Sequence, residues 1–315
     1  MKLIIQIPCF NEEKTLESVI VELPKKIEGI DTIETLIIDD GSTDKTVDLG
    51  IKLGVTYIVK HIGNKWLWSA FRTWVEKALS VGADILVNTD GDNQYPGKYI
   101  EALVQPIIDK KADIVMWDRQ TQSIKHFSPL KKFFQYAWSA LVRFFSGVDV
   151  PDSVSWFRSY SRESLLQLNV TSRFSYAVDT LIQAGNKSLK VEYVKITTNK
   201  PTRPSRLFKN MWEHMAKTCV ILFRVYAMYN PMKIFFTLWI PFLAMGTILL
   251  GRFLYYYSLN PSNTGKVQSL VIAGVFLIIS TQFFALWIIW DLIAKNRKLI
   301  EDNLYFSKKI FYEKK

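Results

Sequence analysis

Two carboxylates stand one residue apart at Asp90 and Asp92, and Gln94 adds a side-chain amide two positions later. The stretch Ile85–Thr89 before them reads as a buried strand, so the three side chains should follow a strand end. Their oxygens are hard ligands that suit Mg²⁺ or Mn²⁺ bridging a diphosphate. We therefore expect Asp90, Asp92 and Gln94 to bind a divalent metal, against the alternative of a solvated acidic loop.

Two more polar segments follow apolar runs. Pro8-Cys9-Phe10-Asn11-Glu12 comes after Leu3–Ile7, and Asp39-Asp40-Gly41-Ser42-Thr43 closes Thr35–Ile38. An aromatic ring can stack on a base, and a strand-end aspartate can accept hydrogen bonds from ribose hydroxyls. Each segment alone would also make an ordinary turn with a capped helix start. Together they indicate a nucleotide site.

A third group of side chains is cationic. Guanidinium forks match phosphate oxygens, although a single Arg is more often a solvated surface residue. The candidates for binding an acceptor phosphate are Arg119, Lys131, Lys132, Ser155, Arg158, Arg203 and Arg206.

The elements that must position these residues alternate along the first 200 residues. Short apolar runs predict strands, and the segments between them have helical spacing, which is typical of an α/β fold with a mostly parallel sheet and helices on both faces. Ligands in such sheets bind at the carboxyl ends of the strands. The expected strands are Leu3–Ile7, Thr35–Ile38, Tyr57–Val59, Ile85–Thr89 and Ile114–Met116, and the expected helices are Lys14–Glu28, Thr43–Leu53, Ala70–Val81 and Gly97–Lys110.

The chain changes character after residue 200. Val267–Trp290 is an uncharged run of 24 residues and Ile234–Gly251 one of 18, each suited to crossing a hydrocarbon core of about 30 Å. Six Lys and Arg precede the pair from residue 201, seven follow it from residue 291, and the connection carries one. The positive-inside rule then predicts a transmembrane hairpin with both termini cytoplasmic.

Composition agrees with a membrane protein. The net charge of +11 calls for an acidic partner, and the Trp-rich apolar runs favour a membrane surface over nucleic acid. Cys9 and Cys219 stand far apart and are expected to be free thiols, and no secretory signal is recognised before Leu3–Ile7. Leu207–Asn230 mixes apolar and basic residues at helical spacing, which predicts an amphipathic helix on the membrane surface or packed on the catalytic domain.

These motifs, in this order, resemble the family-2 glycosyltransferases, in particular the dolichol-phosphate mannose synthase and bacterial polyprenyl-phosphate glycosyltransferase group. The resemblance rests on Pro8-x-Phe10-Asn11-Glu12, Asp39-Asp40-Gly41-Ser42, Asp90-x-Asp92-x-Gln94 and Ser155-x-Phe157-Arg158, and it covers residues 1 to about 210. It implies a GT-A fold. It also implies nucleotide binding by Pro8, Phe10, Glu12, Asp39, Asp40 and Asp90, and catalytic roles for Asp92, Arg119 and Arg158.

The implied activity is transfer of a hexose from a UDP- or GDP-sugar to undecaprenyl or dolichyl phosphate at the cytoplasmic membrane face. A phosphate monoester is mostly a dianion at neutral pH, so no general base is expected, and Asp179 is expected to be structural. An α-linked donor would give an inverted product. The expected parts are a catalytic domain over 1–205, an amphipathic helix over 206–232, two transmembrane helices over 233–292 and a basic tail over 293–315; a homo-oligomer is compatible with them.

The sequence departs from that pattern at five tryptophans. Relatives carry small residues, mostly glycine, where this chain has Trp66, Trp68, Trp74, Trp117 and Trp156. Glycine lets backbone approach a ligand, and an indole does not. Three outcomes are open for Trp66, Trp117 and Trp156: the indoles point away from the site, reshape it for another ligand, or block it. Blocking is expected foremost from Trp156, so returning the three residues to Gly is expected to raise transfer, with the largest gain at Trp156. Two alternatives therefore stand beside the enzyme: an inactive membrane-tethered nucleotide-binding or scaffold protein, and a processive polysaccharide synthase, whose Gln-x-x-Arg-Trp motif is not found here.

Overall fold

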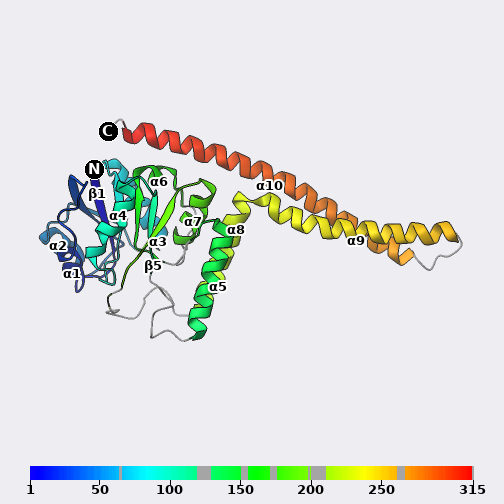
Figure 1. The fold of residues 1–315 in the computed structure, drawn as a ribbon, viewed down its shortest axis with the longest axis horizontal. Coiled ribbons are helices and arrows are strands. Elements are labelled where there is room, and N and C mark those ends of the chain that lie inside the picture. Colours follow the sequence, from blue (N-terminus) through cyan, green and yellow to red (C-terminus); the bar gives the residue numbers. More distant parts are fainter. Residues whose placement is uncertain are drawn as a thin grey trace. The chain divides into compact units, whose positions relative to one another are not determined.

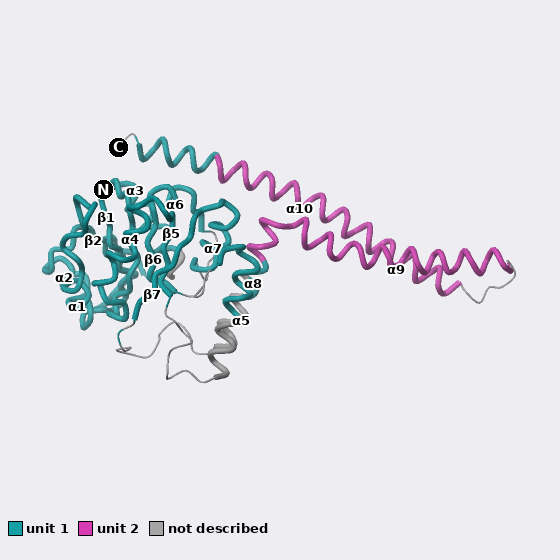
Figure 2. Tube along the Cα trace, in the orientation of Figure 1, with its two compact units in different colours: residues 1–223, 303–315 teal, residues 224–302 magenta. Residues whose placement is uncertain are grey.

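The computed structural model describes residues 1–63, 66–118, 129–149, 155–170, 176–197, 199, 211–260 and 267–313, although the side chains of residues 66–68, 129–137, 211–218 and 221 lie outside the description. The chain forms two compact units (Figure 2). One contains residues 1–223 together with 303–315, and the other contains residues 224–302. The second unit starts later than the predicted end of the catalytic domain, because α8 belongs mostly to the first.

The first unit is built on a seven-stranded sheet of order β3-β2-β1-β4-β6-β5-β7. The strand β6 runs antiparallel to both neighbours, and the other described pairings are parallel. This confirms the mostly parallel α/β sheet. The strands are β1 Lys2–Cys9, β2 Thr32–Asp39, β3 Tyr57–Lys60, β4 Ile85–Asn88, β5 Ile114–Asp118, β6 Arg158–Ser161 and β7 Val191–Lys195, the last two of which were not predicted.

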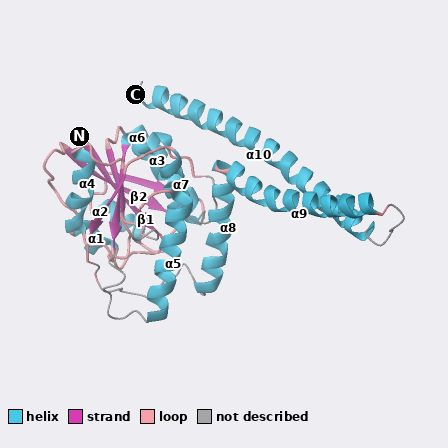
Figure 3. Cartoon of the chain, turned by 45° about the vertical axis from the view of Figure 1, so that its right-hand side comes forward, coloured by secondary structure: helices cyan, strands magenta, loops and turns pink. Residues whose placement is uncertain are grey.

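Helices cover both faces of this sheet (Figures 1 and 3). The predicted helix Lys14–Glu28 is wrong in length, because α1 ends at Val21. Pro24 disfavours helical backbone at Leu23, which explains the early end. The helices of this unit are α1 Leu16–Val21, α2 Thr46–Lys52, α3 Trp66–Ser80, the 3₁₀ turn η1 Gly97–Tyr99, α4 Ile100–Ile108, α5 Pro129–Ser146, α6 Arg162–Gln167 and α7 Tyr176–Asn186.

Alternation along β1 separates two buried layers. Leu3, Ile5 and Ile7 face the apolar core that also contains Leu16 of α1 and Leu103 of α4. The intervening Ile4 and Gln6 are equally buried but face the opposite side of the sheet. The first layer is mostly apolar, whereas the second contains polar groups that reach toward the carboxyl ends of the strands.

Two of the five tryptophans belong to these layers. Trp117 is fully buried in the apolar core, and its Nε1 donates a hydrogen bond to the main-chain oxygen of Ile196 at 2.9 Å. Trp74 is 1% exposed and packs edge-on against Phe71 on α3. Of the outcomes open for Trp117, its indole points away from the ligand site, because it fills the core.

The second unit contains the apolar helices. α8 Met211–Tyr229 leads into α9 Pro231–Leu259 and α10 Val267–Glu313. Both α9 and α10 are long and apolar enough to cross a membrane, and only 6% and 11% of their most apolar windows are buried, so neither is the core helix of a globular domain. Phe242 of α9 packs against Phe276 and Phe283 of α10. The predicted basic tail 293–315 continues α10 as helix up to Glu313.

Candidate active site

The segment after β1 and the segment after β2 are joined by reciprocal hydrogen bonds. The Asn11 amide donates to Ser42 Oγ at 2.9 Å, and Asn11 Oδ1 accepts from the Thr43 amide at 2.8 Å. The Glu12 amide donates to Thr46 Oγ1 at 2.8 Å, at the start of α2. Asn11 has a φ of 56°, a left-handed conformation that Asn tolerates. The two predicted nucleotide-binding segments therefore form one surface.

The acidic segment after β4 lies against the same surface. Thr15 Oγ1 donates to the main-chain oxygen of Gly91 at 2.7 Å. A Cβ atom at Gly91 would lie 3.1 Å from the Pro8 oxygen and 3.2 Å from Glu12 Cγ. Both distances are shorter than ordinary van der Waals contact, so glycine is favoured between Asp90 and Asp92. The predicted nucleotide and metal residues are thus neighbours.

The predicted nucleotide and metal residues differ in exposure, which separates those open to a ligand from those buried beneath them. Phe10 is 37% exposed, so its ring is open to a ligand, and Pro8, Asp40, Asp90, Asp92 and Gln94 are partly exposed. Glu12 and Asp39 are buried, and Asp39 Oδ1 accepts a hydrogen bond from the Ser42 amide at 3.1 Å. Burial raises the pKa of the adjacent Cys9 thiol well above its ordinary value, and Glu12 and Asp39 add to this effect. Cys9 is therefore a protonated packing residue.

Asp92 and Gln94 contact each other. Gln94 Nε2 donates to Asp92 Oδ2 at 3.0 Å, and the Gln94 amide donates to Asp92 Oδ1 at 3.2 Å. Within the described part of the chain, no three His, Cys, Asp or Glu side chains form a ready metal cage. Two carboxylates at a partly exposed strand end nevertheless fit Mg²⁺ or Mn²⁺, since these ions are usually held by one or two carboxylates with phosphate and water oxygens. The donor set fits a metal that arrives with a diphosphate.

Asp40 is oriented by a histidine that was not predicted. His61, 9% exposed, places Nδ1 3.0 Å from Asp40 Oδ1 and Nε2 3.0 Å from Thr73 Oγ1. The His61 amide also donates to the Asp39 oxygen at 2.8 Å. Asp40 is thereby tied through His61 to α3.

Under the acidic segment, polar side chains cross the sheet in register. Gln6 pairs with Asn88, and Asn88 pairs with Arg158. Arg158 is fully buried; its Nε donates to the Ser155 oxygen at 2.7 Å, and its Nη1 donates to the Ala177 oxygen at 2.9 Å. This placement differs from the predicted contact with a substrate phosphate. The antiparallel β6 directs this guanidinium into the protein, where it holds the start of α7 to the Ser155 segment.

Tyr176, at the start of α7, completes this layer. Asn88 Nδ2 donates to the Trp156 oxygen at 2.8 Å and to the Tyr176 hydroxyl at 3.3 Å, and the Trp156 and Tyr176 rings meet edge to face at 4.8 Å. Burial raises the pKa of the Tyr176 phenol well above its usual value, with Tyr160 and then Asp90 adding to the shift. Because Asn88 bonds to Tyr176 and stands two residues before Asp90, the start of α7 lies beside the strand end that carries the acidic segment.

Two more predicted residues lie in this layer. Ser155 is fully buried, so its hydroxyl is not open to an acceptor phosphate, and this differs from the prediction. Asp179 is also fully buried, and its Oδ1 accepts from Gln183 Nε2 at 2.8 Å. Predictions for Arg119, Arg203 and Arg206, and for the side chains of Lys131, Lys132, Trp66 and Trp68, lie outside the described residues.

Sequence reasoning missed four residues of the site: Thr15, His61, Asn88 and Tyr176. Asn88 interrupts the apolar run of β4, and that polar position was the available signal. The other three carry no local signal, because their roles depend on contacts with residues 12 to 88 positions away.

The chain is similar to known members of one protein family. The profile described as "Glycosyl transferase family 2" matches residues 4–168, more than half of the chain. The chain is 29% identical over 213 residues to the UDP-N-acetylglucosamine–dolichyl-phosphate N-acetylglucosaminyltransferase of Methanococcus voltae, covering 61% of this chain and 83% of that protein. It is 21% identical over 207 residues to the undecaprenyl-phosphate mannosyltransferase of Micrococcus luteus, covering 62% and 83%.

A solved structure shares the fold. Glucosyl-3-phosphoglycerate synthase from Mycobacterium tuberculosis, in complex with Mn²⁺, UDP-glucose and phosphoglyceric acid, matches with a TM-score of 0.53 at 20% identity. The match covers 71% of this chain and 79% of that one. At this identity the likeness establishes the fold only.

Proposed function

Because this chain belongs to glycosyl transferase family 2, we propose that it transfers a hexose from a UDP- or GDP-sugar to a polyprenyl phosphate, with inversion and with a divalent metal. The main support is the junction at which Thr15 and Gly91 join the nucleotide-binding segments to Asp90 and Asp92. Relatives named as dolichyl-phosphate and undecaprenyl-phosphate sugar transferases support the lipid acceptor. The two long apolar helices would hold the site at a membrane.

In the proposed reaction the protein positions two charged partners. Phe10 stacks on the base. Asp39 and Asp40, beside Ser42, accept hydrogen bonds from the ribose hydroxyls. Asp90 and Asp92 would hold Mg²⁺ or Mn²⁺, and the chemistry that such an ion would supply is charge compensation on the departing diphosphate. The structural neighbour was solved with Mn²⁺ and UDP-glucose, which supports a divalent metal in the proposed reaction. Arg119 is proposed to meet the acceptor phosphate.

The acceptor explains why a protein base is dispensable. A phosphate monoester has a second pKa near 6, so at neutral pH an oxygen of the dianion can attack the anomeric carbon directly. The bond to the departing nucleoside diphosphate then breaks, and attack opposite to it inverts an α-linked donor. The buried Asp179, already bonded to Gln183, suits a structural role.

The alternative of an inactive scaffold rested on the tryptophans. Trp74 and Trp117 fill the two buried layers, so these two departures from the family pattern do not obstruct a ligand. Trp156 stays the one described tryptophan beside the site, through its contact with Tyr176.

A transfer assay tests the proposal. Membranes containing the protein would be incubated with undecaprenyl or dolichyl phosphate and a panel of labelled UDP- and GDP-sugars. We expect one sugar to move into the lipid fraction, dependent on Mg²⁺ or Mn²⁺. Donor binding without transfer to any lipid would favour the scaffold, and a growing polymer would favour the polysaccharide synthase.

The proposed orientation places the catalytic unit and both termini in the cytoplasm. Tags at Met1 and after Lys315 should be inaccessible from outside intact cells. An impermeant thiol reagent should label Ser262→Cys from outside; labelling only after permeabilisation would reverse the orientation.

A further inference from the structure

One side of α10 is exposed and carries no charge along its whole length. Numbering α10 in heptads with Gln268 as the first position, a, the a positions are every seventh residue from Gln268 to Ile310. The d positions are every seventh residue from Val271 to Phe306. All these side chains are exposed, and none is Asp, Glu, Lys or Arg. We call this line of a and d residues the α10 seam.

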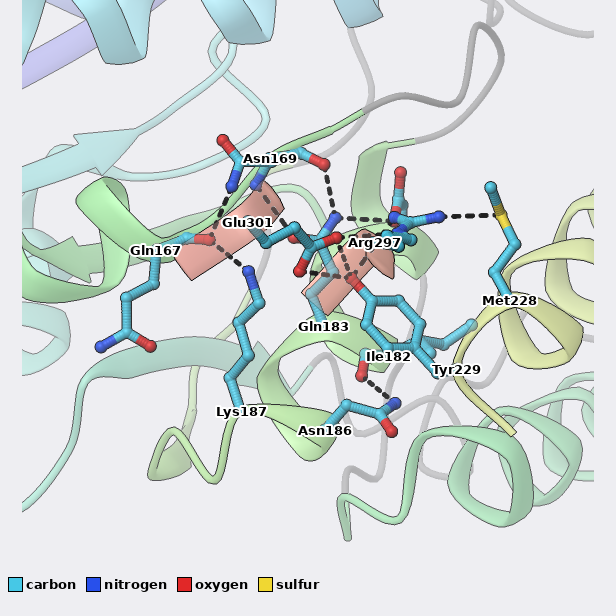
Figure 4. A network of polar contacts seen from close by, with 11 residues as sticks. Gln167, Asn169, Ile182, Gln183, Asn186, Lys187, Met228, Tyr229, Arg297 and Glu301 are labelled. Atoms are coloured by element: carbon cyan, nitrogen blue, oxygen red, sulfur yellow. Dashed lines mark hydrogen bonds and ion pairs between the residues drawn. The ribbon is translucent and has the colours of Figure 1, made fainter. Parts of the chain in front are cut away.

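The opposite side of α10 is engaged within each unit (Figure 4). In the second unit, Glu301 accepts from the Tyr229 hydroxyl at 2.8 Å and from Arg297 Nε at 2.8 Å. In the first unit, Lys308 Nζ donates to Asn169 Oδ1 at 2.7 Å. Glu301 and Lys308 occupy the f position, which lies across the helix from a and d. The seam is therefore the side that the chain itself leaves uncovered.

Beyond the transmembrane run the seam stays apolar. These side chains would face water unless another surface packed against them. Leu292, Leu299 and Phe306 at d are 56%, 63% and 58% exposed, and Ile310 at a is 56% exposed. No Gly or Pro follows Gly274 in α10, so the sequence offers no bend after Trp290. At about 1.5 Å per residue, Ile310 lies about 30 Å along the helix from Trp290. A helix that continues straight along the membrane normal for this distance leaves the hydrocarbon core.

Amides recur at the a positions. Asn296 and Asn303 are exposed in the extension, and Gln282 is exposed inside the uncharged transmembrane run. The aromatic contacts with α9 use other residues, such as Phe276 and Phe283. An amide facing hydrocarbon is costly unless it forms hydrogen bonds, so Gln282 calls for a polar partner in the bilayer. Leu at d with Asn at a is typical of parallel two-stranded coiled coils, in which the Asn fixes register.

We propose that the α10 seam pairs, parallel and in register, with the same seam of a second copy of this chain. Two copies in one membrane leave it in the same direction, which makes the pair parallel. Register then places Gln282, Asn296 and Asn303 each against its own counterpart, where two amides can bond to each other. Eight large apolar side chains of the seam are exposed along α10, four of them beyond Trp290, and at on the order of 100 Å² each they match the roughly 800 Å² per partner of a standard interface.

Disulfide trapping in native membranes tests the pairing. The background is the full chain with Cys219→Ser, since Cys219 is exposed and Cys9 is buried. Leu299→Cys at d should form a disulfide-linked dimer with copper–phenanthroline, whereas its exposed neighbour Lys298→Cys at c should stay monomeric. Equal cross-linking at both positions would overturn the proposal, as would none at Leu299→Cys.

A second measurement keeps the idea testable without cross-linking. Mass photometry of the protein in mild detergent should give the mass of two chains, and Leu292→Arg with Leu299→Arg should give the mass of one, with nucleotide binding retained as the control for folding. A single-chain mass for the parent, or fluorescence quenching of a probe on Leu299→Cys by brominated lipid, would show that water or membrane covers the seam and would refute pairing.

Discussion

The hydroxyl of Thr15 donates a hydrogen bond to the main-chain oxygen of Gly91 at 2.7 Å. These residues are 76 positions apart, and their contact joins the segment that follows β1 to the segment that carries Asp90 and Asp92. The proposed nucleotide and metal functions meet at this contact.

Thr15→Val removes that hydroxyl while keeping the side-chain shape. Loss of a hydrogen bond typically costs about 1 kcal/mol. We expect the free energy of unfolding to fall by about this amount and KM for the nucleotide-sugar to rise by up to about fivefold, because the two segments that bind it are no longer held together. Thr15→Ser, which keeps the hydroxyl, is the control, and an equal rise in KM for both variants would contradict the assigned role.

Metal dependence is the next prediction. Asp92→Asn weakens a hard anionic ligand but can still accept from Gln94, so the fold should persist. We expect metal-dependent binding of the nucleotide-sugar to fall at least tenfold, measured by calorimetry with Mn²⁺. Binding by the parent protein that is unchanged in EDTA would refute the assignment of Asp90 and Asp92.

The buried acid of α7 separates two mechanisms. Asp179→Asn keeps an oxygen that can accept from Gln183 Nε2, so turnover should stay within about threefold of the parent if the phosphate dianion needs no base. Arg119→Ala should instead raise KM for the lipid phosphate more than KM for the donor. Near-complete loss of turnover in Asp179→Asn, with both substrates still bound, would make Asp179 the base.

Contact of the C-terminal end of α10 with the catalytic unit should depend on pH. Burial lowers the pKa of Lys308 from 10.5 to about 8; nearby Lys187 and Arg72 add to the shift, and Glu76 opposes it. Between pH 8 and 10.5 the undocked helix end binds more protons than the docked one, so docking strengthens as pH rises and is weakest below pH 8. Hydrogen exchange of residues 303–313, corrected for its intrinsic pH dependence, should show rising protection from pH 7.5 to 9.5. Lys308→Met should remove this trend; a trend that persists in Lys308→Met would assign it to another group.

The sequence predicts those parts of the fold and of the candidate site whose signal is contained in a short stretch of residues. Pro8–Glu12, Asp39–Ser42 and Asp90–Gln94 are recognisable as candidate site segments because a strand end followed by polar residues is a local pattern. The strand β6 was missed because Arg-Ser-Tyr-Ser has no apolar alternation, since Arg158 and Tyr160 form a buried polar layer. Arg158 was assigned to the substrate because its sequence shows charge but does not show which way an antiparallel strand turns it.

The last prediction separates Trp117 from Trp156. The sequence comparison suggested that returning Trp66, Trp117 and Trp156 to Gly would raise transfer, with the largest gain at Trp156. Trp117 fills the apolar core and bonds to the Ile196 oxygen, so Trp117→Gly should lower the free energy of unfolding by about 3–5 kcal/mol without raising turnover. Trp156 is only partly buried and lies against Tyr176 near the acidic segment, so Trp156→Gly should stay folded and raise kcat if its indole restricts the donor sugar. Thermal melting and steady-state kinetics of the two single variants measure both effects. A lower kcat for Trp156→Gly at unchanged melting temperature would instead make this indole part of the wall that holds the sugar.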